Sequence, residues 1–154
     1  MLHFAFGSNM DQAQMNERCP SARFFAIALF PGHRLAFSRR STTRNCGVAD
    51  AVVDPTAELW GVVYEISEAD VTRLDSREGY RPERSWNSYW RRRCTVLKDG
   101  APALPIEVEA YFAEAEHNPP KPNGHYKGLI VGGAKRWKLP PAYIARLEQI
   151  EVEG

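Results

Sequence analysis

HFAF (residues 3–6) runs directly into GSNM (residues 7–10), and the rest of the chain is organised around this junction. The two phenylalanines share one face at the period of two that is typical of a β-strand. Gly-Ser-Asn then predicts a tight turn straight after a buried strand. Gly7 lets a ligand approach the main chain, while Ser8 and Asn9 add short side-chain donors. Such a turn can aim several N–H groups at one anion, or it can be an ordinary strand-to-helix turn capped by Ser8 or Asn9.

Length and composition indicate one globular domain spanning residues 1–154, with 44% hydrophobic residues. The formal net charge of +1 argues against nucleic acid or an anionic membrane surface as a partner. No apolar run approaches the roughly 18 residues of a membrane span, and no basic segment leads into an apolar one at the N-terminus. We therefore expect a cytoplasmic protein. Its three cysteines and four histidines lack the spacing of a metal site, so we expect reduced thiols and no metal.

The hydrophobic pattern along the chain predicts an α+β domain built round a curled, mostly antiparallel sheet. Turns are expected at Pro31-Gly32 and Asp54-Pro55, and a polar loop over residues 39–47. The expected strands cover residues 23–29, 33–38, 49–53, 59–66, 89–97 and 106–112, in addition to the first. The expected helices cover residues 11–18, 67–78, 126–137 and 141–150.

The helix over residues 67–78 has well-defined ends. Ser67 with Asp70 three residues later resembles a capping box, with Asp in place of the usual Glu or Gln. Gly79 is suited to the left-handed conformation that ends many helices.

Glu78 stands out on this helix because it shares a stripe with two apolar residues, Val71 and Leu74, at spacings i, i+3 and i+7. Burial and the negative end of the helix dipole would both raise its pKa toward the range of a general base. The alternative is that the helix ends a turn earlier and that Glu78 is a solvated rim residue or the partner of an arginine.

Several motifs in order resemble the γ-glutamylcyclotransferase family over nearly the whole chain. Each is short, but the ordered combination is specific. The motifs are FGSNM (6–10), CPSARF (19–24), PGHRLAFS (31–38), GVAD (47–50), LWGVVYEI (59–66), LDSREGY (74–80), YKGLIVGGA (126–134) and LPPAYI (139–144). The resemblance implies a small β-barrel-like sheet with flanking helices and a cavity that opens beside the Gly-Ser-Asn turn.

The resemblance also implies an enzyme that acts on a small-molecule γ-glutamyl substrate without a cofactor. The substrate's α-amine attacks its own γ-carbonyl, which yields 5-oxoproline and releases an amino acid, peptide or amine. Glu78 matches the family's single acid/base. The residues that match the family's substrate-binding positions are Phe6, Gly7, Ser8, Asn9, Met10 and Tyr126. From spacing alone, Tyr126 could equally be an aromatic staple at a helix start.

Two features depart from the family pattern. Phe6 stands where the family commonly has Tyr, which puts the substrate range in question more than the reaction. The Arg- and Trp-rich loop over residues 80–88 is either a rim that selects the leaving group or a loop that packs Trp86 for stability.

Two rival functions stay open. One is a cyclotransferase on the same scaffold that acts on γ-glutamyl amines or a biosynthetic intermediate. The other is a small-molecule binding module without turnover. Arg91-Arg92-Arg93 could suggest a nucleic-acid surface, but strand alternation sends Arg92 to the opposite side from its neighbours and favours a solvated sheet face.

Overall fold

The computed structural model describes residues 1–153, whose strands close into one barrel in the order β1-β3-β2-β4-β5. β1 is antiparallel to β3 and closes the barrel by a parallel pairing with β5, where His3 lies opposite Glu109. This confirms the predicted α+β fold with a mostly antiparallel, barrel-like sheet. The strands are β1 (Leu2–Ala5), β2 (Arg23–Ser41), β3 (Cys46–Glu65), β4 (Tyr89–Lys98) and β5 (Pro105–Ala113).

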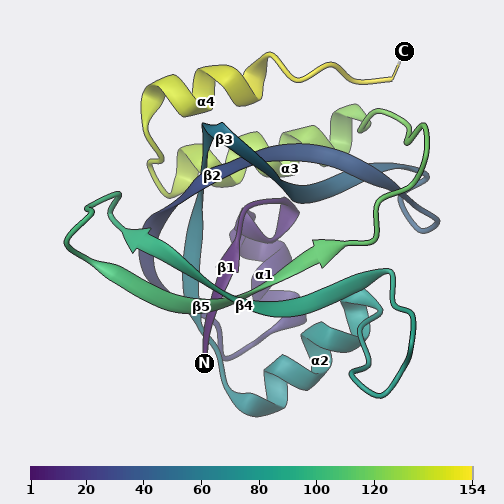
Figure 1. Ribbon diagram of the computed structural model, residues 1–154, viewed down its shortest axis with the longest axis horizontal. Coiled ribbons are helices and arrows are strands. Elements are labelled where there is room, and N and C mark those ends of the chain that lie inside the picture. The colour runs from purple at the N-terminus through teal and green to yellow at the C-terminus, as the bar shows by residue number, and fades with distance from the viewer. Residues whose placement is uncertain (154) are drawn as a thin grey trace.

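Four helices flank the barrel, and all four predicted helices are present within two residues of their expected N-terminal starts and C-terminal ends. Figure 1 shows α3 and α4 together on one side of the strands and α2 on the opposite side. The helices are α1 (Gln12–Arg18), α2 (Glu68–Glu78), α3 (Gly124–Arg136) and α4 (Pro141–Glu148), with a 3₁₀ turn η1 (Ser8–Met10) before α1. None of the helices within residues 1–153 is long and apolar enough to cross a membrane.

β2 and β3 form one long hairpin, so the prediction of four shorter strands was wrong. Pro31 pairs with Glu58 and His33 with Val53, so Gly32 lies opposite residues 54–57. A proline lacks the N–H that a regular ladder needs, and the extra residues form an irregularity that bends the hairpin without ending it. The predicted loop over residues 39–47 was also too long, because only residues 42–45 connect the two strands.

The turn η1 is fixed to the barrel and to α3 by backbone and side-chain contacts. The Tyr64 hydroxyl of β3 donates to the Asn9 carbonyl at 2.9 Å, and the Trp137 indole N–H donates to the Met10 carbonyl at 3.0 Å. Gly133 of α3 packs so closely on η1 that a Cβ there would lie 2.5 Å from the Met10 carbonyl carbon. The core around this contact contains Phe4, Met10, Met15, Leu59, Leu74, Ile130 and Leu139, all nearly or fully buried.

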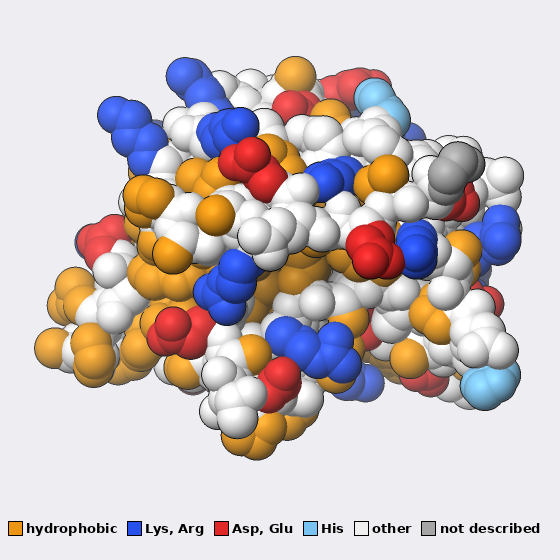
Figure 2. Space-filling view, turned by 90° about the horizontal axis from the view of Figure 1, so that it is seen from above, with side chains coloured by type: hydrophobic (Ala, Val, Ile, Leu, Met, Phe, Trp, Pro, Cys, Tyr) orange, Lys and Arg blue, Asp and Glu red, His pale blue; other side chains and the backbone are white. Residues whose placement is uncertain are grey.

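The surface over α4 mixes acidic and basic side chains. Figure 2 shows red and blue side chains interspersed on this face, with hydrophobic side chains between them. This distribution is in keeping with the near-neutral formal charge of +1.

Candidate active site

A cavity of about 730 Å³ opens between η1, the C-terminal end of α2 and the β2–β3 hairpin. Its wall brings together most of the predicted site residues: Phe6, Gly7, Ser8, Asn9, Glu78 and Tyr126. Met10 is different, because it is 0% exposed and its side chain belongs to the core. The structure therefore gives no support to the expectation that Met10 contacts substrate.

The Gly-Ser-Asn turn presents two backbone N–H groups that precede the first hydrogen bond of η1. That first bond runs from the Met10 N–H to the Gly7 carbonyl at 3.1 Å. Within residues 1–153, the N–H groups of Ser8 and Asn9 have no protein acceptor, as is usual at a helix start. Gly7 packs closely here, since a Cβ would lie 3.0 Å from that of Ala49. The turn can therefore offer two N–H donors to an anion.

The side chains of Ser8 and Asn9 are oriented from α1. The Gln14 side-chain N–H₂ donates to Ser8 Oγ at 2.8 Å and to Asn9 Oδ1 at 3.0 Å. Arg18 Nη1 donates to the same Asn9 Oδ1 at 2.9 Å. The Asn9 Nδ2 group consequently faces the other way, toward Glu78, whose Oε1 accepts from it at 3.5 Å.

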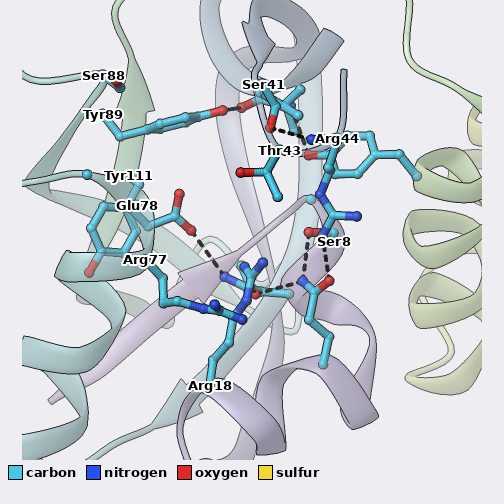
Figure 3. A pocket seen from close by; sticks show the side chains of 18 of the residues that line it. Ser8, Arg18, Ser41, Thr43, Arg44, Arg77, Glu78, Ser88, Tyr89 and Tyr111 are labelled. Carbon is cyan, nitrogen blue, oxygen red and sulfur yellow. Dashed lines mark hydrogen bonds between the residues drawn. The ribbon is translucent and has the colours of Figure 1, made fainter. Parts of the chain in front are cut away.

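Glu78 ends α2 and projects into the cavity. The helix runs through this residue to Gly79, which caps it with φ of 71°, so the alternative that the helix ends a turn earlier is wrong. Burial raises the pKa of Glu78, while the positive charge of Arg18 and the bond from Asn9 lower it to a smaller extent. Figure 3 shows the Glu78 carboxylate pointing into the cavity, with Arg18 and Arg77 on one side and Tyr89 on another.

Asp75, the neighbouring carboxylate of α2, is occupied elsewhere. Its Oδ1 accepts from Arg91 Nε at 3.0 Å and from the Tyr111 hydroxyl at 2.5 Å. These bonds hold α2 to β4 and β5. Glu78, in contrast to Asp75, projects into the cavity without a close ion pair.

Tyr126 lies in the first turn of α3 with its ring buried and its hydroxyl in the cavity wall. The hydroxyl accepts the Ala49 N–H of β3 at 2.9 Å, and the Arg44 guanidinium lies 4.9 Å from the ring centre. Burial raises the pKa of Tyr126 to about 12, so the hydroxyl stays protonated at neutral pH. Because the Ala49 N–H occupies an acceptor position, the hydroxyl proton remains for another partner.

Arginines dominate the charge of the cavity wall. The basic side chains that line it are Arg18, Arg39, Arg40, Arg44 and Arg77, against the acidic Glu17 and Glu78. Such a wall favours a ligand that carries carboxylates.

The Arg- and Trp-rich loop does not bury its tryptophan. Trp86 is 52% exposed, with the Arg39 guanidinium 5.1 Å from its ring centre. Asn87 closes the loop instead, since it is fully buried and bonds both the N–H and the carbonyl of Arg81. The exposure of Trp86 gives no support to the alternative that the loop packs it for stability, and Trp86 lies beside an arginine of the cavity wall.

Several residues of the cavity wall were not predicted from the sequence, among them Gln14, Arg18 and His3. Gln14 and Arg18 have no motif of their own, and only the fold brings them to the turn. His3 is 2% exposed, its ring nitrogens have no partner within residues 1–153, and burial lowers its pKa to about 4. The strand period gave no signal for His3, because it places His3 on the face opposite Phe4 and Phe6. Within the described residues no group of three His, Cys, Asp or Glu side chains could hold a metal ion.

Comparisons with known proteins agree on one family. Residues 58–147 match the model of the AIG2-like family. The chain is 32% identical to γ-glutamylcyclotransferase of Bos taurus and to that of Homo sapiens, over 97% of this chain and 78% of each relative. A solved structure described as a γ-glutamyl cyclotransferase superposes with a TM-score of 0.88 at 29% identity, over 99% of this chain and 89% of the other. The closed barrel, the cavity beside its first turn and these matches together place the chain in the γ-glutamylcyclotransferase family.

Proposed function

We propose that this γ-glutamylcyclotransferase uses Glu78 as its single general base and acid, and the Ser8 and Asn9 N–H groups to bind an anionic part of the substrate. The observation that carries the proposal is the position of Glu78. It projects with a raised pKa into a cavity that Ser8 and Asn9 also line, and the N–H groups of these two residues have no protein acceptor within residues 1–153. This combination supplies a proton acceptor and an anion grip in one site.

The reaction needs no water and no cofactor. Glu78 takes a proton from the substrate's α-ammonium, and the freed amine attacks the γ-carbonyl carbon to form the C–N bond of a five-membered lactam. As the tetrahedral intermediate collapses, the bond to the leaving nitrogen breaks. Glu78 returns its proton to the leaving nitrogen and then accepts the second proton of the attacking nitrogen, which passes on to the released amine. The products are 5-oxoproline and the free amine, which is protonated in water.

The proposed substrate contacts follow from the cavity wall. Ser8 and Asn9 bind the α-carboxylate or the developing oxyanion through their N–H groups, and Tyr126 offers its hydroxyl proton. Phe6 supplies an apolar surface where the family's tyrosine would add a hydroxyl. We leave Met10 out of this set, because its side chain is buried in the core.

The arginines favour a γ-glutamyl compound whose leaving group carries a carboxylate over a γ-glutamyl amine. Trp86 and Arg39 at the rim are the residues best placed to contact that leaving group. The free thiols of Cys19, Cys46 and Cys94 fit a reducing compartment, and we propose that the protein is cytoplasmic.

The test is 5-oxoproline release from a panel of γ-glutamyl dipeptides, γ-glutamyl amines and glutathione. Glu78→Gln keeps the shape and removes the base, so we expect it to lose roughly a hundredfold or more. Glu68→Gln is the matched control, since it makes the same change at an exposed position of the same helix. If no panel member yields 5-oxoproline while ligands still stabilise the fold, the protein is a binding module and the proposal fails.

A further inference from the structure

Four side chains from four separate segments form one directed chain of hydrogen bonds that ends on Glu78. Arg44 Nη2 donates to Gln14 Oε1 at 2.6 Å, and Gln14 Nε2 donates to Asn9 Oδ1 at 3.0 Å. Asn9 Nδ2 donates to Glu78 Oε1 at 3.5 Å. Arg44 belongs to the β2–β3 turn, Gln14 to α1, Asn9 to η1 and Glu78 to α2.

Every link in this chain points the same way, because an amide accepts only at oxygen and donates only at nitrogen. Two donors, from Gln14 and Arg18, converge on Asn9 Oδ1. A rotation of the Asn9 amide by half a turn would place its own N–H₂ group against both donors. Gln14 is constrained likewise, since Arg44 holds its oxygen and Ser8 Oγ accepts from its nitrogen.

We propose that Gln14 and Arg44 are positioning residues, which hold the Asn9 amide with its N–H₂ group toward Glu78 and thereby set the proton affinity of the base. The proposal rests on the function proposed above, in which Glu78 accepts the substrate's proton. A donor that faces a carboxylate stabilises its ionised form. In this site it opposes the burial that favours the protonated form of Glu78.

The charged and titratable groups around Glu78 keep their protonation states near pH 7, so the orientation of the Asn9 amide can change the pKa of Glu78 without interference from them. Arg18, Arg44 and the adjacent Arg77 contribute fixed positive charge, and Asp75 is held by Arg91. The remaining neighbours are neutral at pH 7, because burial raises the pKa values of the tyrosines and the thiol and lowers that of the histidine. These neutral neighbours are Tyr89 of β4, Tyr111 of β5, Tyr126 of α3, Cys19 after α1, and His3 of β1 in the same wall.

The experiment measures kcat/KM against pH, whose acid limb reports the ionisation of the base in the free enzyme. Gln14→Met keeps the length of the side chain and removes the amide. We expect the acid midpoint to move up by roughly half to one pH unit, since the carboxylate loses a fixed donor. Activity well below the midpoint then falls about three- to tenfold and returns near wild type at high pH. Gln12→Met is the matched control, because Gln12 lies on the same helix and bonds Arg136 outside the site.

Arg44→Met separates positioning from charge. Alone, it should move the midpoint in the same direction. In the Gln14→Met background it should move the midpoint less than it does alone, because the part that acts through Gln14 is already lost and only the direct charge effect of Arg44 on Glu78 remains. A carbon-13 NMR titration of the Glu78 carboxyl in free protein follows the same ionisation without turnover. It also serves if a variant has too little activity to profile.

Three results would overturn the proposal: an acid midpoint and a Glu78 titration that do not move, a uniform loss of activity at every pH, or fully additive shifts. These results differ from a failure of the proposed function. If Glu78→Gln keeps its activity, the base assignment is lost; if Glu78→Gln is inactive but Gln14→Met leaves the pH profile unchanged, only the positioning role is lost.

Discussion

Each end of α2 carries a carboxylate that is not fully exposed, and the surroundings shift the pKa values of these two carboxylates in opposite directions. At the N-terminal end, Asp70 accepts the Ser21 N–H at 2.8 Å and also a short bond from the Ser21 hydroxyl. These bonds hold the pKa of Asp70 below its usual range. At the C-terminal end, Glu78 has one bond of 3.5 Å, and burial raises its pKa.

The contrast separates a structural carboxylate from one available for chemistry. The helix dipole stabilises a negative charge at Asp70 and disfavours one at Glu78. Ser21 donates two hydrogen bonds to Asp70, whereas Glu78 accepts one long bond and keeps free acceptor positions. A carboxylate that lines a cavity and has a raised pKa is therefore a better guide to a functional site than burial alone.

The largest expected difference between the two ends is in activity. Changing Glu78→Gln should lower kcat/KM by roughly a hundredfold or more, while Asp70→Asn should leave it within about threefold. Both changes replace a carboxylate by its amide. Measuring 5-oxoproline release from both proteins under one set of conditions makes the comparison. Equal losses in the two variants would contradict the separation of roles.

For stability the order of the two variants should be reversed, with the larger loss in Asp70→Asn. Asp70→Asn should lower the free energy of unfolding by about 1 to 2 kcal/mol, because the Ser21 donors lose a charged acceptor at a helix start. Glu78→Gln should leave it unchanged or raise it, since the variant no longer buries a charge. Urea denaturation at pH 7 measures both, with Glu68→Gln as the reference for removing an exposed carboxylate from the first turn of the same helix. A greater loss for Glu78→Gln than for Asp70→Asn would break the comparison.

The pH dependence of stability should also differ in sign between the two ends. Glu78 has a folded pKa above its usual 4.5, so its contribution is fully present below that pH and is lost as pH rises through the folded value. Asp70 has a folded pKa below its usual 3.8, so its contribution is present above that pH and is lost as pH falls through the folded value.

Urea denaturation from pH 3 to 8 tests these two signs. The advantage of Glu78→Gln over wild type should grow as pH rises from about 4.5, and the deficit of Asp70→Asn should shrink below about 3.8. His3 destabilises the fold as pH falls from 6.5 toward about 4, where it becomes protonated. Because all three proteins share His3, differences between them cancel its contribution. Parallel curves for the two variants would refute the opposite signs.

The smallest expected effect comes from the glycine that ends α2. Gly79 has φ of 71°, and a Cβ there would meet Ser88 only at 3.8 Å. Gly79→Ala should therefore cost about 1 kcal/mol through the left-handed backbone alone. Gly128→Ala in α3 is the matched control and should be neutral or stabilising, since it lies inside a helix with open space around it. Equal thermal shifts in both variants would show that the backbone of Gly79 is not the cause.

Local patterns in the sequence carried most of what could be predicted about α2. Ser67 does cap the helix, since its Oγ accepts the Asp70 N–H at 3.2 Å. The reciprocal half of the capping box was wrong: Asp70 turns to Ser21, whose hydroxyl accepts the Ser67 N–H instead. Ser21 lies far from this helix in the sequence, so the exchange depends on tertiary packing that no local pattern contains.

The same limit applies to the long hairpin and the cavity. Pro31-Gly32 and Asp54-Pro55 carry the chemistry of turns, but they bend one hairpin because they oppose each other across it. Gln14 and Arg44 are ordinary surface residue types, and only the fold makes them neighbours of Asn9. The residues that could be predicted from the sequence either belong to a motif or conflict with the hydrophobic pattern. Glu78 is an example of such a conflict, because it is a charged residue on an apolar stripe.

The closure of the barrel by β1 has a consequence for the order of folding. β1 precedes its partners, which lie in β3 and β5 about 60 and 106 residues further along the chain. Pairings over such separations form slowly, because closing a long loop costs conformational entropy before any contact between the strands can offset it. The β2–β3 hairpin needs no such closure. We therefore expect β1 to be among the last elements to become ordered, so that refolding recovers sheet structure before it recovers activity.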